Sequence, residues 1–319
     1  METKAVLVFG SLNADLVIRA DRLPREGETL QGGDLAVYPG GKGANQAFAA
    51  ARLGAKTSMF GAVGSDVFGD LLLESLRGGA VDVSGVQRTD RATGSALITV
   101  LPNGENSILL APGANAAVDP SWLDTMAKAL DGKPIVLCQL EVPLPSVEAL
   151  LRMAAPKGAR VILDPAPARA LDAEILRLAH IVTPNQTECA LLIDRVNRPP
   201  ETYEDAREAC RLLHERGVGI AIVKMGEQGC FVSDGTASST ESFIIPAYSV
   251  DPVDTTAAGD TFNAGLAAAL AEGRSLRSAV ELGTAAAAIS VTRPGAQASA
   301  PTRQEAEDLM RAQKARRGS

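Results

Sequence analysis

Residues 254–262 read Asp254-Thr255-Thr256-Ala257-Ala258-Gly259-Asp260-Thr261-Phe262, and this stretch carries the strongest structural signal in the chain. Its small residues at 257–259 directly precede a segment of helical character at residues 261–271. The first N–H groups of a helix have no partner within the helix, and small side chains let an anion approach them. The stretch therefore predicts an anion site formed by the backbone at residues 257–260.

Asp260 stands at the same point and has two interpretations. Its carboxylate could accept the proton of a substrate hydroxyl, which would place a general base beside the donors for a developing oxyanion. Aspartate is also a common capping residue at the start of a helix. The stretch alone leaves both interpretations open.

A second glycine cluster, Pro39-Gly40-Gly41-Lys42-Gly43-Ala44-Asn45-Gln46, precedes another helical segment at residues 47–53. It is similar to a phosphate-binding loop, but Lys42 is followed by Gly43, so no hydroxyl is placed for Mg²⁺ as in a Walker A motif. The apolar run at residues 5–9 is likewise not followed by the glycine pattern of a dinucleotide fold. Neither common nucleotide-binding motif is therefore present at these positions.

Polar side chains follow that first apolar run at Asn13 and Asp15, which we expect at the carboxyl end of the first strand. Open α/β sheets bind ligands at this edge. Together with Lys42 and Asn45, these residues offer hydrogen-bond partners suited to a polyol. Taken singly, each is more typical of a turn or of a solvated charge.

Three later strand ends also carry polar residues. Glu141 follows the apolar run at residues 135–140. After Ile181, Glu188 could hold Mg²⁺ through water while Asn185 meets a phosphate, or the pair could simply open a helix. The stretch Lys224-Met225-Gly226-Glu227-Gln228-Gly229 forms a glycine turn, which is often only a hairpin.

Short apolar runs alternate with helical stretches along the chain, which predicts a mostly parallel sheet buried on both faces. The predicted strands lie at residues 5–9, 58–63, 135–140, 161–163, 181–182 and 220–223. Two stretches break this rhythm: residues 16–37 are polar, and residues 95–101 and 107–111 flank an Asn-Gly turn typical of a hairpin. We expect them to form an antiparallel accessory sheet, either a lid or a hairpin beside a long surface loop.

Composition narrows the classes of function. Lys and Arg number 31 against 38 Asp and Glu, a net charge of −7, which disfavours a nucleic-acid binder without excluding a nucleotide site. Aromatic residues make up only 3%, which argues against base stacking. With 2 His, there is little room for a histidine-rich metal site or a Ser-His-Asp hydrolase.

The four cysteines are widely spaced and include no C-x-x-C pair, which predicts small buried thiols in a reducing compartment. They are Cys138, Cys189, Cys210 and Cys230. The run at residues 5–9 is too short for a signal peptide, and no run of about 18 apolar residues could span a membrane. We expect a cytoplasmic protein with a solvated basic tail at residues 311–319.

Taken together, these motifs resemble those of the ribokinase-like family of sugar and nucleoside kinases, also called the pfkB family. The resemblance spans about residues 4–310 and rests on signatures at 40–47, 185–188 and 254–260 in the expected order. Within the family, residues 10–15 and 291–297 are most similar to members that phosphorylate ribose. The resemblance implies one three-layer α/β/α domain over residues 1–310, with a small β-sheet lid formed by segments 15–37 and 95–111.

The resemblance also implies ATP-dependent phosphorylation of D-ribose at O5, with Asp260 as general base. The anion hole would comprise Ala257, Ala258, Gly259 and Asp260. The positions that match the family's sugar contacts are Asn13, Asp15, Gly41, Lys42, Asn45, Glu141 and Asp260. Those that match its ATP contacts are Asn185, Lys224, Met225, Gly226, Glu227, Gln228, Gly229, Gly259 and Thr284.

Two cations are implied by the same resemblance: Mg²⁺, held at Glu188 through water, and an activating K⁺. The matching K⁺ positions, several through backbone carbonyls, are Asp254, Thr256, Ser290, Arg293, Gly295 and Ser299. Lys224 stands where the family often has Thr, and Thr284 where it often has Asn, which affects nucleotide contacts and not the reaction. Members pair as homodimers through the lid, so we expect that assembly here.

Two alternatives remain beside ribose phosphorylation. The first is a family kinase for another sugar or a nucleoside, such as deoxyribose, fructose or adenosine. The second is a non-catalytic sugar-binding or regulatory protein on the same fold, against which the intact Asp260 argues.

Overall fold

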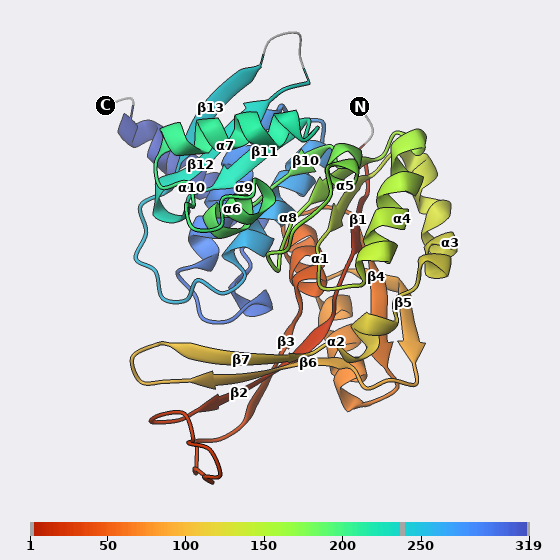
Figure 1. Ribbon diagram of the computed structural model, residues 1–319, viewed down its shortest axis with the longest axis vertical. Helices are drawn as coiled ribbons and strands as arrows, with labels where there is room; N and C mark the ends of the chain where they lie inside the picture. The colour runs from red at the N-terminus through yellow and green to blue at the C-terminus, as the bar shows by residue number, and fades with distance from the viewer. Residues whose placement is uncertain (1–2, 237–239, 318–319) are drawn as a thin grey trace.

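A nine-stranded sheet forms the centre of the computed structural model, which describes residues 3–236 and 240–317 (Figure 1). The strands from β11 to β5 run parallel, and β12 and β13 are antiparallel additions at one edge. In spatial order they are β13 (Glu241–Pro246), β12 (Gly229–Asp234), β11 (Ile220–Lys224), β10 (Ile181–Val182), β9 (Arg160–Leu163), β8 (Ile135–Cys138), β1 (Val6–Phe9), β4 (Thr57–Gly64) and β5 (Asp82–Thr89).

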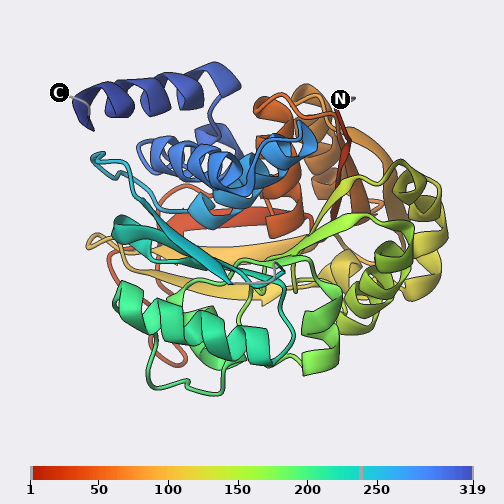
Figure 2. The same ribbon diagram turned by 90° about the horizontal axis from the view of Figure 1, so that it is seen from above.

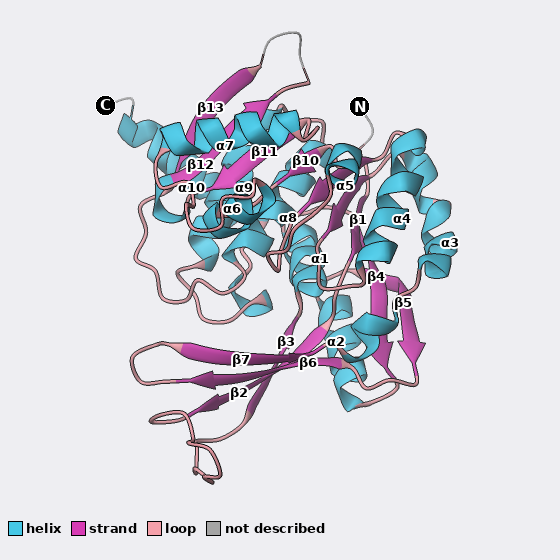
Figure 3. Ribbon diagram, in the orientation of Figure 1, coloured by secondary structure: helices cyan, strands magenta, loops and turns pink. Residues whose placement is uncertain are grey.

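Helices cover both faces of this sheet and complete the predicted three layers (Figures 2 and 3). On one face lie α1 (Lys42–Arg52), α2 (Val67–Gly78), α8 (Ala258–Ala271), α9 (Leu276–Ser290) and α10 (Arg303–Arg317). On the other lie α3 (Asp124–Ala127), α4 (Leu144–Ala154), α5 (Ala173–Leu178), α6 (Gln186–Leu192) and α7 (Tyr203–Glu215). The α/β/α fold expected from the alternating apolar runs is confirmed.

The two-residue period of the strands divides the core into two clusters. In β1, Val6 and Val8 face one cluster while Leu7 and Phe9 face the other, and all four are buried. This burial on both sides explains why the strand sequence is continuously apolar.

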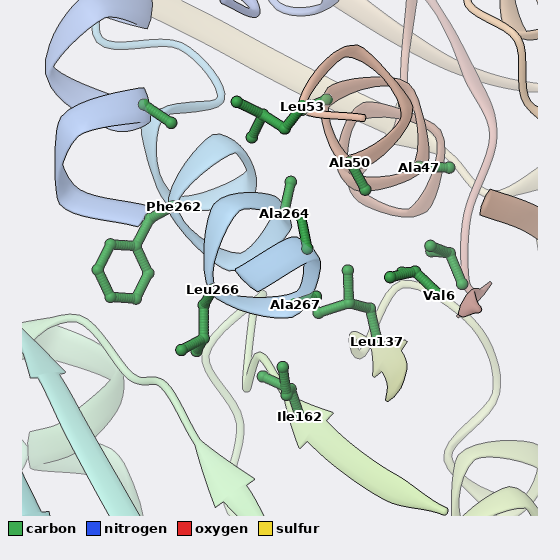
Figure 4. Packing of buried hydrophobic residues seen from close by; sticks show 14 of the residues in the cluster. Val6, Ala47, Ala50, Leu53, Leu137, Ile162, Phe262, Ala264, Leu266 and Ala267 are labelled. Atoms are coloured by element: carbon green, nitrogen blue, oxygen red, sulfur yellow. The ribbon is translucent and has the colours of Figure 1, made fainter. Parts of the chain in front are cut away.

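Small residues bring α1 and α8 close together (Figure 4). Ala47 and Ala50 of α1 and Ala264 and Ala267 of α8 are fully buried in the same cluster. Since α1 carries Asn45 and Gln46 and α8 carries Asp260, this packing decides how near those polar groups lie.

A separate small sheet stands off the central one (Figure 1). Within the described residues it has four strands, in the order β3 (Ala36–Gly40), β2 (Asn13–Arg19), β6 (Gly94–Val100) and β7 (Asn106–Ala111). The predicted hairpin is confirmed by the antiparallel pairing of β6 with β7.

Two expectations about this small sheet were wrong. It is not antiparallel throughout, because β2 runs parallel to β6. Because β1 and β5 run in the same direction, the chain leaves both strands at the carboxyl end of the central sheet. The strands that follow them, β2 and β6, therefore point the same way. Asn13 and Asp15 also do not end the first strand: β1 stops at Phe9, and both residues belong to β2.

The cysteines, the apolar helices and the C-terminal stretch can also be compared with the sequence predictions. All four cysteines are free and buried, as predicted. No helix in the described part of the chain is long and apolar enough to cross a membrane. Helix α10 continues past residue 310 to Arg317, so the basic stretch begins within a helix. Residues 318 and 319 of the predicted tail lie outside the described residues.

Candidate active site

Asp260 is the third residue of α8 and is only 5% exposed. The helix begins after Ala257, which has a φ of +58°, and Asp260 makes no capping hydrogen bond. Instead its Oδ1 accepts a hydrogen bond from Gln46 Nε2 at 3.0 Å, and its Oδ2 accepts one from Asn45 Nδ2 at 3.3 Å. The two amides of α1 therefore orient a buried carboxylate at the start of α8, and the capping interpretation does not hold.

The surroundings of Asp260 adjust its acidity. Burial raises the pKa of Asp260 to about 6, the charge of Lys42 opposes that rise, and the charges of Asp164 and Glu141 add to it. A carboxylate with a pKa near 6 is ionised at neutral pH yet basic enough to accept a proton in a reaction. The side chain thus suits the role of general base.

A second carboxylate, Glu141, lies beyond the end of β8 and accepts hydrogen bonds from a loop, from β2 and from α1. Its Oε2 accepts hydrogen bonds from Ser11 Oγ, from Asn13 Nδ2 at 3.5 Å and from Lys42 N at 3.2 Å. Burial, together with the charges of Glu141 and Asp260, raises the pKa of Asp15 to about 7. These carboxyl groups lie near enough to influence one another and offer acceptors to a ligand with several hydroxyl groups.

The glycine cluster serves close packing of the backbone around these groups. Gly41 has a φ of +89°, and a Cβ there would lie 2.6 Å from Asn13 N. A Cβ on Gly40 would lie 2.1 Å from Asp15 Oδ2. The start of α1 can therefore sit directly against β2. In addition, Asn45 Oδ1 is buried without a hydrogen-bond partner among the described residues, which leaves an acceptor for a ligand hydroxyl.

The residues expected on the nucleotide side also lie together. Asn185 and Lys224 form an isolated parallel bridge, and Lys224 Nζ lies 3.3 Å from the point that a Cβ would occupy on Gly259. Thr284 of α9 donates to Val280 O and lies 4.0 Å from Cys230 Sγ, next to the turn that ends at Gly229. This turn, with the short 3₁₀ helix η5 (Gly226–Gln228), joins β11 and β12 as the predicted hairpin.

Glu188 takes part in capping the start of α6, as the second of its two interpretations predicted. It forms a capping box with Asn185: Asn185 N donates to Glu188 Oε2 at 2.7 Å, and Glu188 N donates to Asn185 Oδ1 at 2.8 Å. Burial raises the pKa of Glu188, while the charge of Lys224 lowers it. Because its carboxyl group keeps a second oxygen, capping is compatible with a water-mediated contact to Mg²⁺.

One carboxylate, Asp254, joins two of the other expected K⁺ positions, Thr256 and Gly295. Asp254 Oδ1 accepts from Thr256 N at 2.9 Å, and Asp254 Oδ2 accepts from Gly295 N at 2.8 Å. The guanidinium of Arg293 instead pairs with Glu305, so only its carbonyl could face a cation. Ser290 and Ser299 use their hydroxyl protons on nearby carbonyls and keep their oxygen lone pairs. A carboxylate with carbonyl and hydroxyl oxygens from two loops is a donor set that fits a hard monovalent cation.

Sequence reasoning gave no role to four residues that bond to candidate site residues: Ser11, Gln46, Asn115 and Asp164. Asn115 lies in the 3₁₀ helix η1 (Gly113–Ala117) and is 1% exposed. Its Oδ1 accepts a hydrogen bond from Leu12 N, and its Nδ2 donates to Leu12 O and Asn13 Oδ1, at 2.8–3.0 Å. No local pattern singles it out. Asp164 follows β9 at the same sheet edge as Glu141, so the rule that selected Glu141 could have found it.

The comparisons agree with this geometry. Residues 3–303 match the pfkB family carbohydrate kinases. The chain belongs to this family.

Three pfkB relatives show how far the likeness extends. Ribokinase from Haemophilus influenzae is 41% identical over 308 residues, covering 96% of this chain and 98% of its own. Deoxyribokinase from Salmonella typhi is 35% identical over 299 residues, covering 93% and 95%. The structure of Arabidopsis thaliana ribokinase complexed with ribose and ATP has a TM-score of 0.90 at 32% identity, covering 97% and 99%. The chain is therefore a carbohydrate kinase, as its motifs predicted.

Proposed function

We propose that the protein transfers the γ-phosphoryl group of ATP to O5 of D-ribose, giving ribose 5-phosphate and ADP. The observation that carries the proposal is the buried Asp260 carboxylate on the first turn of α8, where helix-start N–H groups suit an anion and where, among the described residues 257–260, only the N–H of Ala258 already donates, to Thr255 O at 3.3 Å. The full-length likeness to ribokinases, one of them solved with ribose and ATP, supports the choice of substrates.

In the proposed reaction, Asp260 accepts the proton of the ribose 5-hydroxyl as its oxygen attacks the γ-phosphorus. The N–H groups at Ala257, Ala258, Gly259 and Asp260 would stabilise charge on the transferring group. Phosphoryl transfer needs placement and charge stabilisation more than covalent chemistry, and a fixed carboxylate beside fixed donors supplies both.

The sugar site would lie among Asn13, Asp15, Gly41, Lys42, Asn45 and Glu141. The carboxylates of Asp15 and Glu141 accept hydrogen bonds from hydroxyl groups, and the unpaired Asn45 Oδ1 offers a further acceptor. Lys42 lies among carboxylates: burial lowers its pKa, but Asp260, Asp164 and Glu141 raise it more, so its ammonium stays charged. A polyol that presents several hydroxyl groups in a fixed pattern fits this set.

ATP would bind across Asn185, Lys224, Gly259, Thr284 and the turn Met225–Gly229. Magnesium is expected at Glu188 through water. Mg²⁺ is commonly held mainly by phosphate oxygens and one or two carboxylates. When bound, it would neutralise phosphate charge.

Potassium would be held by Asp254, Thr256, Ser290, Arg293, Gly295 and Ser299. A cation there would offset negative charge near the start of α8 and stiffen the two loops that Asp254 already joins. We expect activity to rise with K⁺ at constant ionic strength.

A panel of acceptors with ATP, followed by coupled ADP release with and without K⁺, tests the proposed function. Ribose should give the highest kcat/KM. Deoxyribose is the main competitor because a deoxyribokinase is among the similar proteins, and fructose and adenosine complete the panel. Turnover of adenosine or deoxyribose without turnover of ribose would overturn the choice of substrate.

We also propose a homodimer formed through the small sheet. Leu97 of β6 and Leu109 of β7 are register partners, so they share a face, and they are 50% and 69% exposed. Apolar side chains exposed side by side on a sheet favour association. Sedimentation velocity should give a dimer, and Leu109→Asp should shift it toward monomer.

The four buried free thiols support the predicted cytoplasmic location.

A further inference from the structure

A buried aspartate outside the predicted site, Asp164, contacts both halves of the active centre. It is 2% exposed and follows β9. Its Oδ2 accepts a hydrogen bond from Gln46 Nε2 at 2.9 Å, and its Oδ1 pairs with Lys224 Nζ at 3.0 Å. One carboxylate is therefore shared between the base side and the nucleotide side.

On the base side, Gln46 transmits the constraint. Its Nε2 donates to Asp260 Oδ1 as well as to Asp164, and its Oε1 accepts from Gln139 Nε2 at 2.6 Å. An amide whose nitrogen and oxygen are both engaged in this way cannot flip without losing all three bonds. Asp164 thus helps to lock the amide that orients the Asp260 carboxylate.

On the nucleotide side, Lys224 stands at the anion site. Its side chain is 14% exposed, and its Nζ lies 3.3 Å from the point that a Cβ would take on Gly259, the second residue of α8. An ammonium group has three N–H donors. With one given to Asp164, the others can reach an anion bound at the start of α8.

We propose that Asp164 is a positioning residue for phosphoryl transfer, holding Lys224 against the anion site and, through Gln46, fixing Asp260. This inference rests on the proposed function. A purely structural ion pair between the ends of β9 and β11 would explain the Asp164–Lys224 contact. It would not explain why the same carboxylate shares Gln46 with Asp260, or why Nζ lies beside Gly259.

The pH dependence of kcat separates these two explanations. The charged groups that face Asp260 are Lys42 of α1, Glu141 after β8, Asp15 of β2 and Asp164 itself. Asp164→Asn keeps an acceptor for Gln46 but removes one negative charge that opposes ionisation of Asp260. We expect the acid limb of the kcat profile to move to lower pH in this variant, and kcat to fall roughly tenfold to a hundredfold from misplacement of Lys224.

Variants of Lys224 test the other half. Lys224→Met should raise the KM for ATP and lower kcat, with the KM for ribose unchanged, and Lys224→Arg should retain more activity than Lys224→Met. The double variant of Asp164→Asn with Lys224→Met should be about as active as Lys224→Met alone, because coupled residues are not additive. Thermal unfolding of each variant checks that it folds.

Asp194→Asn is the matched control. It breaks an ion pair of 2.7 Å with Arg216 that lies outside the site, so both KM values and the pH profile should stay unchanged. ATP titration by calorimetry gives a readout that does not need turnover. If the unmodified chain phosphorylates no acceptor, the proposed function fails, and weaker ATP binding by Lys224→Met would still support the role of Lys224. Unchanged ATP binding in Lys224→Met, or an unshifted acid limb in an active, folded Asp164→Asn, would overturn the inference.

Discussion

Replacing Asp260 by asparagine should strongly reduce activity and at the same time stabilise the fold. The side chain is 5% exposed, and burial raises its pKa from 3.8 to about 6. A raised pKa means that the folded protein resists ionising this group. The proposed role as general base, by contrast, needs the ionised form. The same carboxylate would therefore be useful to the reaction, while it is costly to the fold.

The size of the effect follows from the two pKa values. A difference of about two units corresponds to about 3 kcal/mol of stability. This stability is fully present below the ordinary pKa of 3.8 and is lost as the pH rises through about 6. At pH 7.5, Asp260→Asn avoids the loss and should be up to about 3 kcal/mol more stable than the unmodified chain. At pH 5 the gain should shrink to about half.

Hydrogen bonding can adapt to the asparagine. Asn45 and Gln46 both donate to the carboxylate, so the new amide NH₂ would face one donor too many. Asn45 can rotate its amide and present the Oδ1 that now lacks a partner in the described chain. Any residual mismatch would reduce the gain, because an unsatisfied buried polar group costs about 1–3 kcal/mol.

Urea unfolding at pH 7.5 and pH 5, together with turnover of ribose, measures both effects. We expect kcat to fall by a factor on the order of 10²–10⁴, as for loss of a general base. The exposed Asp194→Asn serves as the control and should show no stability gain that depends on pH. Full turnover in Asp260→Asn would refute the assignment of the base. Lower stability at pH 7.5 would refute the argument that the buried charge is costly.

Three further substitutions probe the rest of the site. Gly41→Ala adds a Cβ 2.6 Å from Asn13 N at a φ of +89°, so the KM for ribose should rise at least about tenfold, and unchanged kinetics would contradict the packing argument. Asn115→Ala leaves Leu12 and Asn13 without their buried partner. The free energy of unfolding, measured with urea, should fall by about 3 kcal/mol, and the KM for ribose should rise more than the KM for ATP. Asp254→Asn keeps only one acceptor for the N–H groups of Thr256 and Gly295, so a K⁺ titration should show weaker activation, while full activation would place the cation elsewhere.

Much of the central fold could be predicted from the sequence because strands buried on both faces leave a local trace. Val6 to Phe9 are all apolar since alternate residues enter two different cores. The small sheet was harder to predict. Its hairpin is marked by Asn103 and Gly104, but the parallel pairing of β2 with β6 joins segments about 80 residues apart and depends on where β1 and β5 leave the central sheet.

The candidate site divides in the same way. Asp260, Gly41 and Asn45 stand in short motifs whose residue types already suggest an anion and a polyol. Asn115 has no such motif, because its role exists only through contact with Leu12 and Asn13, about 100 residues earlier. The position of Asp164 directly after a strand could have marked it as a candidate. No sequence pattern predicts its ion pair with Lys224.

The sequence by itself determined the layered α/β fold and singled out the candidate site residues, since apolar periodicity, small residues at a helix start and strand-end polar groups are local properties. Only the tertiary structure decided which of those groups act on one another. The pKa of Asp260 near 6, the shared amide of Gln46 and the place of Lys224 beside Gly259 arise from burial and from charges brought together by distant segments. Electrostatic interaction depends on distance in space, and a sequence records only distance along the chain.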